Sequence, residues 1–203
     1  SLAQGLAHAP EHLACYELTI EEGTPFGRMV DTGELTLPNE EEALTMADLT
    51  HTFLAQAGLQ RYEISNYAAP GRECRHNINY WRNGDYLGLG AGAVSCLSGF
   101  RFGTVQEPGL FARLVQAGEL PLAEGECLPL APRFRESVVM GLRMLEGVSF
   151  ALLQRQFGLT PVEYYGKILE DLRQQGLVAV SKESLRLTEA GLPVANQVLA
   201  RLV

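Results

Sequence analysis

The chain has 203 residues, of which 46% are hydrophobic and 20% are charged, as is typical of a globular protein with one large or two ordinary domains. Its formal net charge of −8 would repel a phosphate backbone, so we do not expect nucleic acid as a partner. No apolar run approaches the length of a membrane span, and the N-terminal residues lack the features of a signal peptide. We therefore expect a cytoplasmic protein with no transmembrane segment.

The first part of the chain predicts a strand, a long helix and a second strand. The strands are expected over 12–20 and 59–67, and the helix over 39–57. Asn39 precedes three glutamates, which suit the start of a helix, and Gly58 supplies a left-handed stop. This order predicts a parallel βαβ unit, beyond whose strand ends ligands usually bind.

The polar segment "YEISN" closes the second expected strand. Glu63, Ser65 and Asn66 either face a pocket at the strand end or serve the local fold. In the second case Glu63 points to solvent or pairs with Arg61, and Asn66 caps a turn.

A Gly-rich run, "GLGAGA" over 88–93, fits the dinucleotide-binding pattern G-x-G-x-x-A. The following residues do not resemble a helix, so we reject a dinucleotide-binding fold. Two interpretations remain open: the glycines let the backbone approach a ligand, or they allow a tight passage from strand to loop.

The rest of the chain predicts a short helix at 107–117, a Gly- and Pro-rich linker over 119–132, and a separate C-terminal domain. Three helices, a hairpin over 177–188 and a final helix near Pro193 follow the order of a winged-helix domain. Between Pro161 and Thr188 there are four basic and four acidic residues, so this segment has no excess of positive charge. A packing or partner-binding module is therefore favoured over a DNA-binding one.

The segment "RHNINYW" over 75–81 is the strongest candidate site. An isolated histidine is most often structural, but His76 has a phenol and the single indole of the chain nearby. An imidazole can ligate a heme iron, and flat aromatic rings can stack on a porphyrin. No pair of the cysteines has a close metal-binding spacing, so we expect four free, mostly buried thiols: Cys15, Cys74, Cys96 and Cys127.

The segment "RHNINYW" and several other segments of the chain resemble the C-terminal part of the HemW family of radical SAM heme chaperones. These proteins are relatives of oxygen-independent coproporphyrinogen III oxidase. The resemblance depends chiefly on H-N-x-x-Y-W and departs from the family at Cys15 and Val94, where Ser and His are common. The other matching segments are "CYELTIEEGTPF", "YEISNYAAPG", "YLGLGAGAVS", "ESVVMGLRML", "LRLTEAGL" and "NQVLARL".

The resemblance implies an α/β fold: the last part of a radical SAM partial β/α barrel over 1–118, the linker 119–132, and a winged-helix-like α+β domain over 133–203. In the family, a C-x-x-x-C-x-x-C motif holds a [4Fe–4S] cluster that binds S-adenosylmethionine. This chain lacks the motif, so we expect it to bind no cluster and to be catalytically inactive by itself.

The resemblance also implies the site residues. A proposed heme site carries over onto His76, Asn77, Tyr80 and Trp81, with His76 as the iron ligand. Weaker candidates for contact with S-adenosylmethionine are Gly88, Gly90, Ala91 and Gly92.

Three functions follow for the full-length protein. The favoured one is a carrier that binds heme and delivers it to a heme-dependent protein. The second is an enzyme that decarboxylates coproporphyrinogen III oxidatively, and the third is a scaffold with a partner module and no ligand. An incomplete barrel would leave a sheet edge unpaired, so we also expect self-association through that edge.

Overall fold

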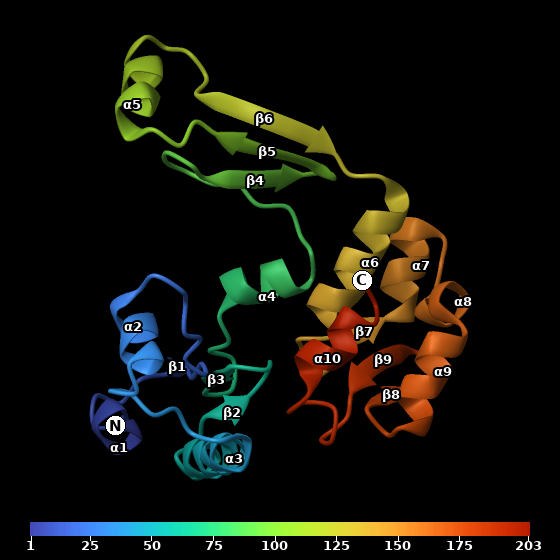
Figure 1. Cartoon of the computed structure of the whole chain (residues 1–203). Helices are drawn as coiled ribbons and strands as arrows, with labels where there is room; N and C mark the ends of the chain where they lie inside the picture. Colours follow the sequence, from blue (N-terminus) through green and yellow to red (C-terminus); the bar gives the residue numbers. More distant parts are fainter. The chain divides into compact units, whose positions relative to one another are not determined.

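The computed structural model describes residues 1–203, the whole chain. The chain forms two compact units, Ser1–Cys74 and Arg75–Val203. Each unit mixes helices with small antiparallel sheets of three strands (Figure 1). None of the helices is both long enough and apolar enough to cross a membrane.

The first unit packs helices against one small sheet. Its core contains Leu54, Leu59 and Tyr67, which are almost completely buried. The elements of this unit are α1 (Leu2–Leu6), β1 (His12–Ala14), α2 (Pro25–Asp31), α3 (Glu40–Gln56), β2 (Gln60–Arg61) and β3 (Asn66–Ala68).

The long helix α3 begins and ends as its sequence predicts. The Asn39 side chain accepts a hydrogen bond from the Glu42 backbone N–H at 3.0 Å, and the Glu42 carboxylate accepts one from the Asn39 N–H at 2.9 Å. This reciprocal capping box satisfies two backbone donors that the helix itself cannot. After the last turn, Gly58 adopts a φ of 84°, which turns the chain out of the helix.

The predicted parallel pairing on either side of α3 is wrong. β1 and β2 both pair antiparallel with β3, which lies between them. β1 and β2 therefore run in the same direction without touching. The expected strands 12–20 and 59–67 are also too long, because β1 has three residues and the second strand is interrupted by a turn.

The second unit contains two sheets and most of the helices. Its elements are α4 (Arg75–Trp81), β4 (Val94–Leu97), β5 (Phe100–Thr104), α5 (Pro108–Gln116), β6 (Leu122–Cys127), α6 (Leu130–Gly141), β7 (Val148–Ser149), α7 (Phe150–Phe157), α8 (Pro161–Tyr165), α9 (Lys167–Gln174), β8 (Val178–Val180), β9 (Ser184–Leu187) and α10 (Ala195–Ala200).

The sheet β4-β5-β6 includes residues that the sequence predicts as a linker. β4 and β5 form a hairpin whose tip, Ser98 and Gly99, has φ values of 51° and 82°, as expected for a tight two-residue turn. The chain then passes through α5 and returns as β6, which pairs antiparallel with β5. The segment 119–132 thus holds a strand and the start of α6, and the two compact units divide elsewhere, after Cys74.

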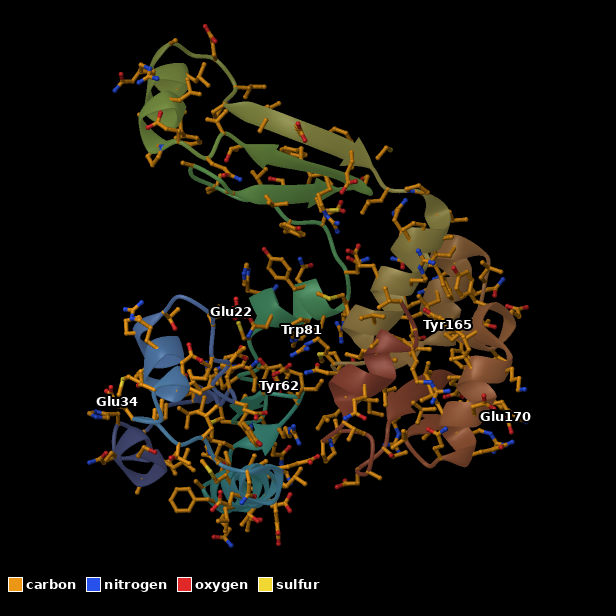
Figure 2. All side chains as sticks on the ribbon, in the orientation of Figure 1. Glu22, Glu34, Tyr62, Trp81, Tyr165 and Glu170 are labelled. Atoms are coloured by element: carbon orange, nitrogen blue, oxygen red, sulfur yellow. The ribbon has the colours of Figure 1, made fainter.

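An aromatic cluster forms the core between the C-terminal helices. Phe134 of α6 is fully buried, and its ring contacts those of Phe157 and Tyr164 at 5.6 Å and 4.7 Å between centroids. The Tyr165 hydroxyl donates to the Leu202 carbonyl at 2.8 Å and so ties the chain end to this core. Figure 2 labels Tyr165 among these helices.

Most of the predicted C-terminal elements are present, with one interruption. α7 ends at Gly158 with a φ of 70°, the hairpin β8–β9 forms within 177–188, and α10 starts after Pro193. The helix expected after Thr160 is split into α8 and α9, because Gly166 adopts a φ of 48° and a ψ of −113° that no helix tolerates.

Candidate functional site

The segment "RHNINYW" forms the whole of helix α4 (Figure 1). Its end is fixed by Asn83, which has a φ of 50°. The N–H groups of Asn83 and Gly84 donate to the carbonyls of Tyr80 and Asn79, both at 2.9 Å. This is the Schellman pattern, with asparagine in the left-handed position that glycine more often takes.

His76 and Tyr80 lie on the same face of α4, one turn apart. Their rings meet edge to face, with centroids 4.9 Å apart and an interplanar angle of 72°. His76 is exposed, and neither of its ring nitrogens has a hydrogen-bond partner. An accessible imidazole nitrogen next to an aromatic ring fits the demands of an axial heme ligand.

Tyr86, which the sequence pattern does not single out, extends this aromatic pair. Its ring lies 4.6 Å from that of Tyr80, and its backbone forms a β-bridge with Cys96 at the outer side of β4. Burial raises the pKa of the Tyr86 phenol, which opposes ionisation of this ring. His76, Tyr80 and Tyr86 form a continuous row, which we call the aromatic row.

Trp81 does not belong to the aromatic row. It follows His76 by five residues, which places the two side chains about 140° apart around a helix of 3.6 residues per turn. The Arg143 guanidinium carbon lies 4.4 Å from the Trp81 ring centre, a cation–π contact just beyond α6. Trp81, labelled in Figure 2, thus holds α4 against its neighbour in the unit.

Two further contacts fasten the end of α4 to α6 and the turn that follows it. The Asn83 side-chain amide donates to the Ser137 hydroxyl at 3.0 Å. Arg82 pairs with Glu146 at 3.0 Å, but both side chains are mostly exposed, so this ion pair contributes little stability. The aromatic row is therefore carried by a helix whose other side is anchored in the second unit.

The Gly-rich run leads into strand β4 and not into a helix, which confirms that it is no dinucleotide-binding fingerprint. Gly88 fills a tight passage, because a Cβ there would lie 2.3 Å from the Val94 carbonyl oxygen. The Gly88 N–H donates to the Ser95 hydroxyl at 3.0 Å. Beyond it Gly90 and Gly92 have φ values of 111° and 71°. These backbone conformations favour glycine whether or not a ligand contacts the loop.

The segment "YEISN" forms the turn between β2 and β3. The Arg61 guanidinium donates to the carbonyls of Glu63 and Ile64. One carboxylate oxygen of Glu63 accepts from the Ser65 N–H at 2.6 Å and from the Asn66 amide at 2.5 Å. Glu63 is completely buried, not exposed as one alternative proposed, and its other carboxylate oxygen has no hydrogen-bond partner.

The second unit has a cavity of about 110 Å³ beside the end of α4. Its lining includes Asp85, Cys96, Glu136 and Gln156. Ligand pockets usually measure about 300–1,000 Å³, so this cavity cannot enclose a porphyrin.

The chain offers no site for an iron–sulfur cluster. All four cysteines are free thiols, as expected, but the expected burial is wrong, because three are half-buried and Cys127 is exposed. No three His, Cys, Asp or Glu side chains lie where they could hold a metal ion together. The residues present therefore do not fit the [4Fe–4S] cluster that the sequence resemblance implies for full-length members of the family.

Comparisons with known proteins identify relatives of this chain. The HemN C-terminal domain family matches residues 128–194. The chain is 39% identical to the heme chaperone HemW of Synechocystis sp. over 75% of this chain and 38% of that protein. It is 30% identical to HemW of Bacillus subtilis over 98% of this chain and 52% of that protein.

The fold has a solved counterpart. Coproporphyrinogen III oxidase (HemN) from Escherichia coli, described as a radical SAM enzyme, matches 99% of this chain and 50% of its own with a TM-score of 0.74 and 19% identity. The family model and the curated relatives define the class as HemN-related proteins. Within that class, the chain belongs to the HemW family. The HemW relatives that align with nearly all of this chain are about twice as long, so the chain spans about half of their length.

Proposed function

We propose that this chain supplies the heme-binding part of a heme chaperone. His76 ligates the heme iron, and Tyr80 and Tyr86 lie along the porphyrin. The observation that carries the proposal is the exposed, unpartnered imidazole of His76 at the end of the aromatic row. The names of the HemW relatives support heme as the cargo and a heme-requiring protein as its recipient.

The roles of the predicted site residues differ under this proposal. Asn77 lies half-buried on the side of α4 next to His76 and has no side-chain hydrogen bond, so it is free to contact the porphyrin edge. Trp81 acts by positioning α4, because its ring is already engaged by Arg143. Contact of the Gly88–Gly92 loop with S-adenosylmethionine stays a prediction, supported by the exposure of Ala91 and Gly92.

We further propose that residues 1–118 correspond to the end of the radical SAM barrel, and that residues 133–203 form a winged-helix-like module. The order of α6 to α10 around the hairpin β8–β9 supports the second assignment. The functional division at 119–132, a cytoplasmic location and self-association through a sheet edge remain predictions. Sedimentation analysis of the chain tests the last of these.

The second candidate is a part of an oxygen-independent coproporphyrinogen III oxidase. The fold similarity to HemN favours it. The exposed imidazole of His76 in the H-N-x-x-Y-W segment favours the carrier, and so do the names of the HemW relatives.

A hemin titration followed at the Soret band tests the proposal. Loss of an outer partner of a metal ligand costs about 10–100-fold in affinity, so His76→Ala should weaken binding by at least about tenfold. The matched control is His8→Ala, which removes another exposed histidine and should leave binding unchanged. Equal titrations of all three proteins would refute His76 as the ligand.

A further inference from the structure

Strand β6 is the open edge of the second unit's larger sheet. The strand order is β4-β5-β6, and all six residues from Leu122 to Cys127 are exposed. The opposite edge, β4, is partly paired, because Tyr86 forms an antiparallel bridge with Cys96 along its outer side. Figure 1 shows β6 as the outermost strand of this sheet.

The backbone of β6 presents hydrogen-bonding groups outward. In an antiparallel pair, residues alternate between those that bond across the ladder and those that turn away from it. The Leu128 N–H donates to the Gly99 carbonyl at 3.1 Å, so the ladder bonds fall at that pair and at the Arg101–Glu126 pair. The N–H and C=O groups of Gly125 and Cys127 therefore point away from β5 and are free to pair with another strand.

The two faces of this edge differ in chemistry. Glu126 lies opposite Arg101, and Glu124, two residues away, shares its face. Arg101 lies 3.9 Å from Glu126 but 2.6 Å from Glu136, and Glu124 has no ion pair at all. Glu126 thus shares its cation with Glu136, and Glu124 has none.

The other face is apolar. Cys127 lies opposite Phe100, and Phe100 lies opposite Leu97, so the three share this face. Phe102 follows Phe100 on the same face, and their rings stack with centroids 5.7 Å apart. Gly125 leaves room for this arrangement, because a Cβ there would lie 2.7 Å from the Phe100 ring.

We propose that β6 binds an extended segment of a partner protein, added as a fourth strand, in which basic residues alternate with apolar ones. The basic residues would meet Glu124 and Glu126, and the apolar residues would extend the Phe100 face. A second copy of the chain fits poorly, because pairing β6 with itself about Gly125 sets Glu124 opposite Glu126. This docking edge does not depend on heme binding.

The test measures binding of a fluorescent peptide with alternating lysine and valine by anisotropy at physiological ionic strength. Cys127→Pro removes an outward N–H and places a ring where the added strand would lie, without touching the ladder to β5. It should weaken binding by about tenfold or more, whereas Cys127→Ser should not. Glu124→Lys should weaken it as well, and a glutamate–valine peptide should not bind.

Equal binding by the native chain, Cys127→Pro and Glu124→Lys would overturn the proposal, since only general charge attraction would then remain. Self-association that Cys127→Pro abolishes would also overturn it, because the edge would then serve a second copy. Circular dichroism checks the fold of each variant. If Cys127→Pro is unfolded, the comparison of Glu124→Lys with Glu124→Gln decides, and unchanged peptide affinity in both refutes the proposal.

Discussion

Gly141, at the end of α6, is predicted to resist replacement by alanine. In most helices this change is favourable, by up to about 1 kcal/mol, because alanine restricts the unfolded chain and suits the helix. Here a Cβ would lie 2.2 Å from Val148 Cγ1 and 3.7 Å from the Trp81 carbonyl oxygen. Val148 is buried and β-branched, so its methyl group cannot swing away.

The expected result is a net loss of stability. Overpacking a core by one methyl group costs about 1–3 kcal/mol, which exceeds the helix gain and leaves roughly 1 kcal/mol of destabilisation. For a chain of this size that lowers the melting temperature by about 2–4 °C.

A double-mutant cycle with Val148→Ala isolates the clash. Val148→Ala by itself should destabilise the chain by leaving a cavity, whereas in the Gly141→Ala background it should cost less, since the new methyl group occupies that space. Urea unfolding of the four proteins gives the coupling. A melting temperature raised by Gly141→Ala, or additive effects of the two changes, would refute the packing argument.

Two further predictions concern helix ends in the C-terminal part. Thr160→Ala removes the hydroxyl that accepts from the Glu163 N–H at 3.3 Å, so the free energy of unfolding should fall by about 0.5–2 kcal/mol, while Thr160→Ser should preserve it. Hydrogen bonds from Arg173 and Gln174 lower the pKa of the Glu170 carboxyl from 4.5 to about 2, so its small stabilising effect should persist above about pH 4.5 and disappear as the pH falls towards 2. Glu170→Gln should flatten that part of the pH–stability curve, and an unchanged curve would contradict the assignment.

The sequence by itself was sufficient for features that depend on neighbouring residues. The capping residues Asn39 and Thr160, the helix stop at Gly158 and the hairpin within 177–188 are all present. Each of these involves hydrogen bonds or side-chain periodicity over a few residues, which the local sequence specifies. The failure to predict the break at Gly166 shows the limit, because glycine is tolerated within many helices and only the φ adopted here ends one.

In the candidate site, too, some features follow from the local sequence and others arise only from tertiary contacts. The spacing of His76 and Tyr80 places them on one helical face, and their motif alone was enough to indicate the site. The porphyrin contact that the same motif suggested for Trp81 stays a prediction, and nothing in the sequence indicated that Arg143, from a distant part of the chain, lies over its ring. Tyr86 was missed because its contact with Tyr80 arises from a turn between them and not from helical spacing.

Only the tertiary structure decided which strands pair. The insertion of β3 between β1 and β2, and the return of β6 to β5 after α5, join segments that are separated in the chain. Short strands carry little sequence signal of their own partner, because hydrogen bonding between backbones is the same for every residue type except proline. Their pairing follows from how the whole unit buries its apolar side chains, and that also determines which edge, β6, is left open to a partner.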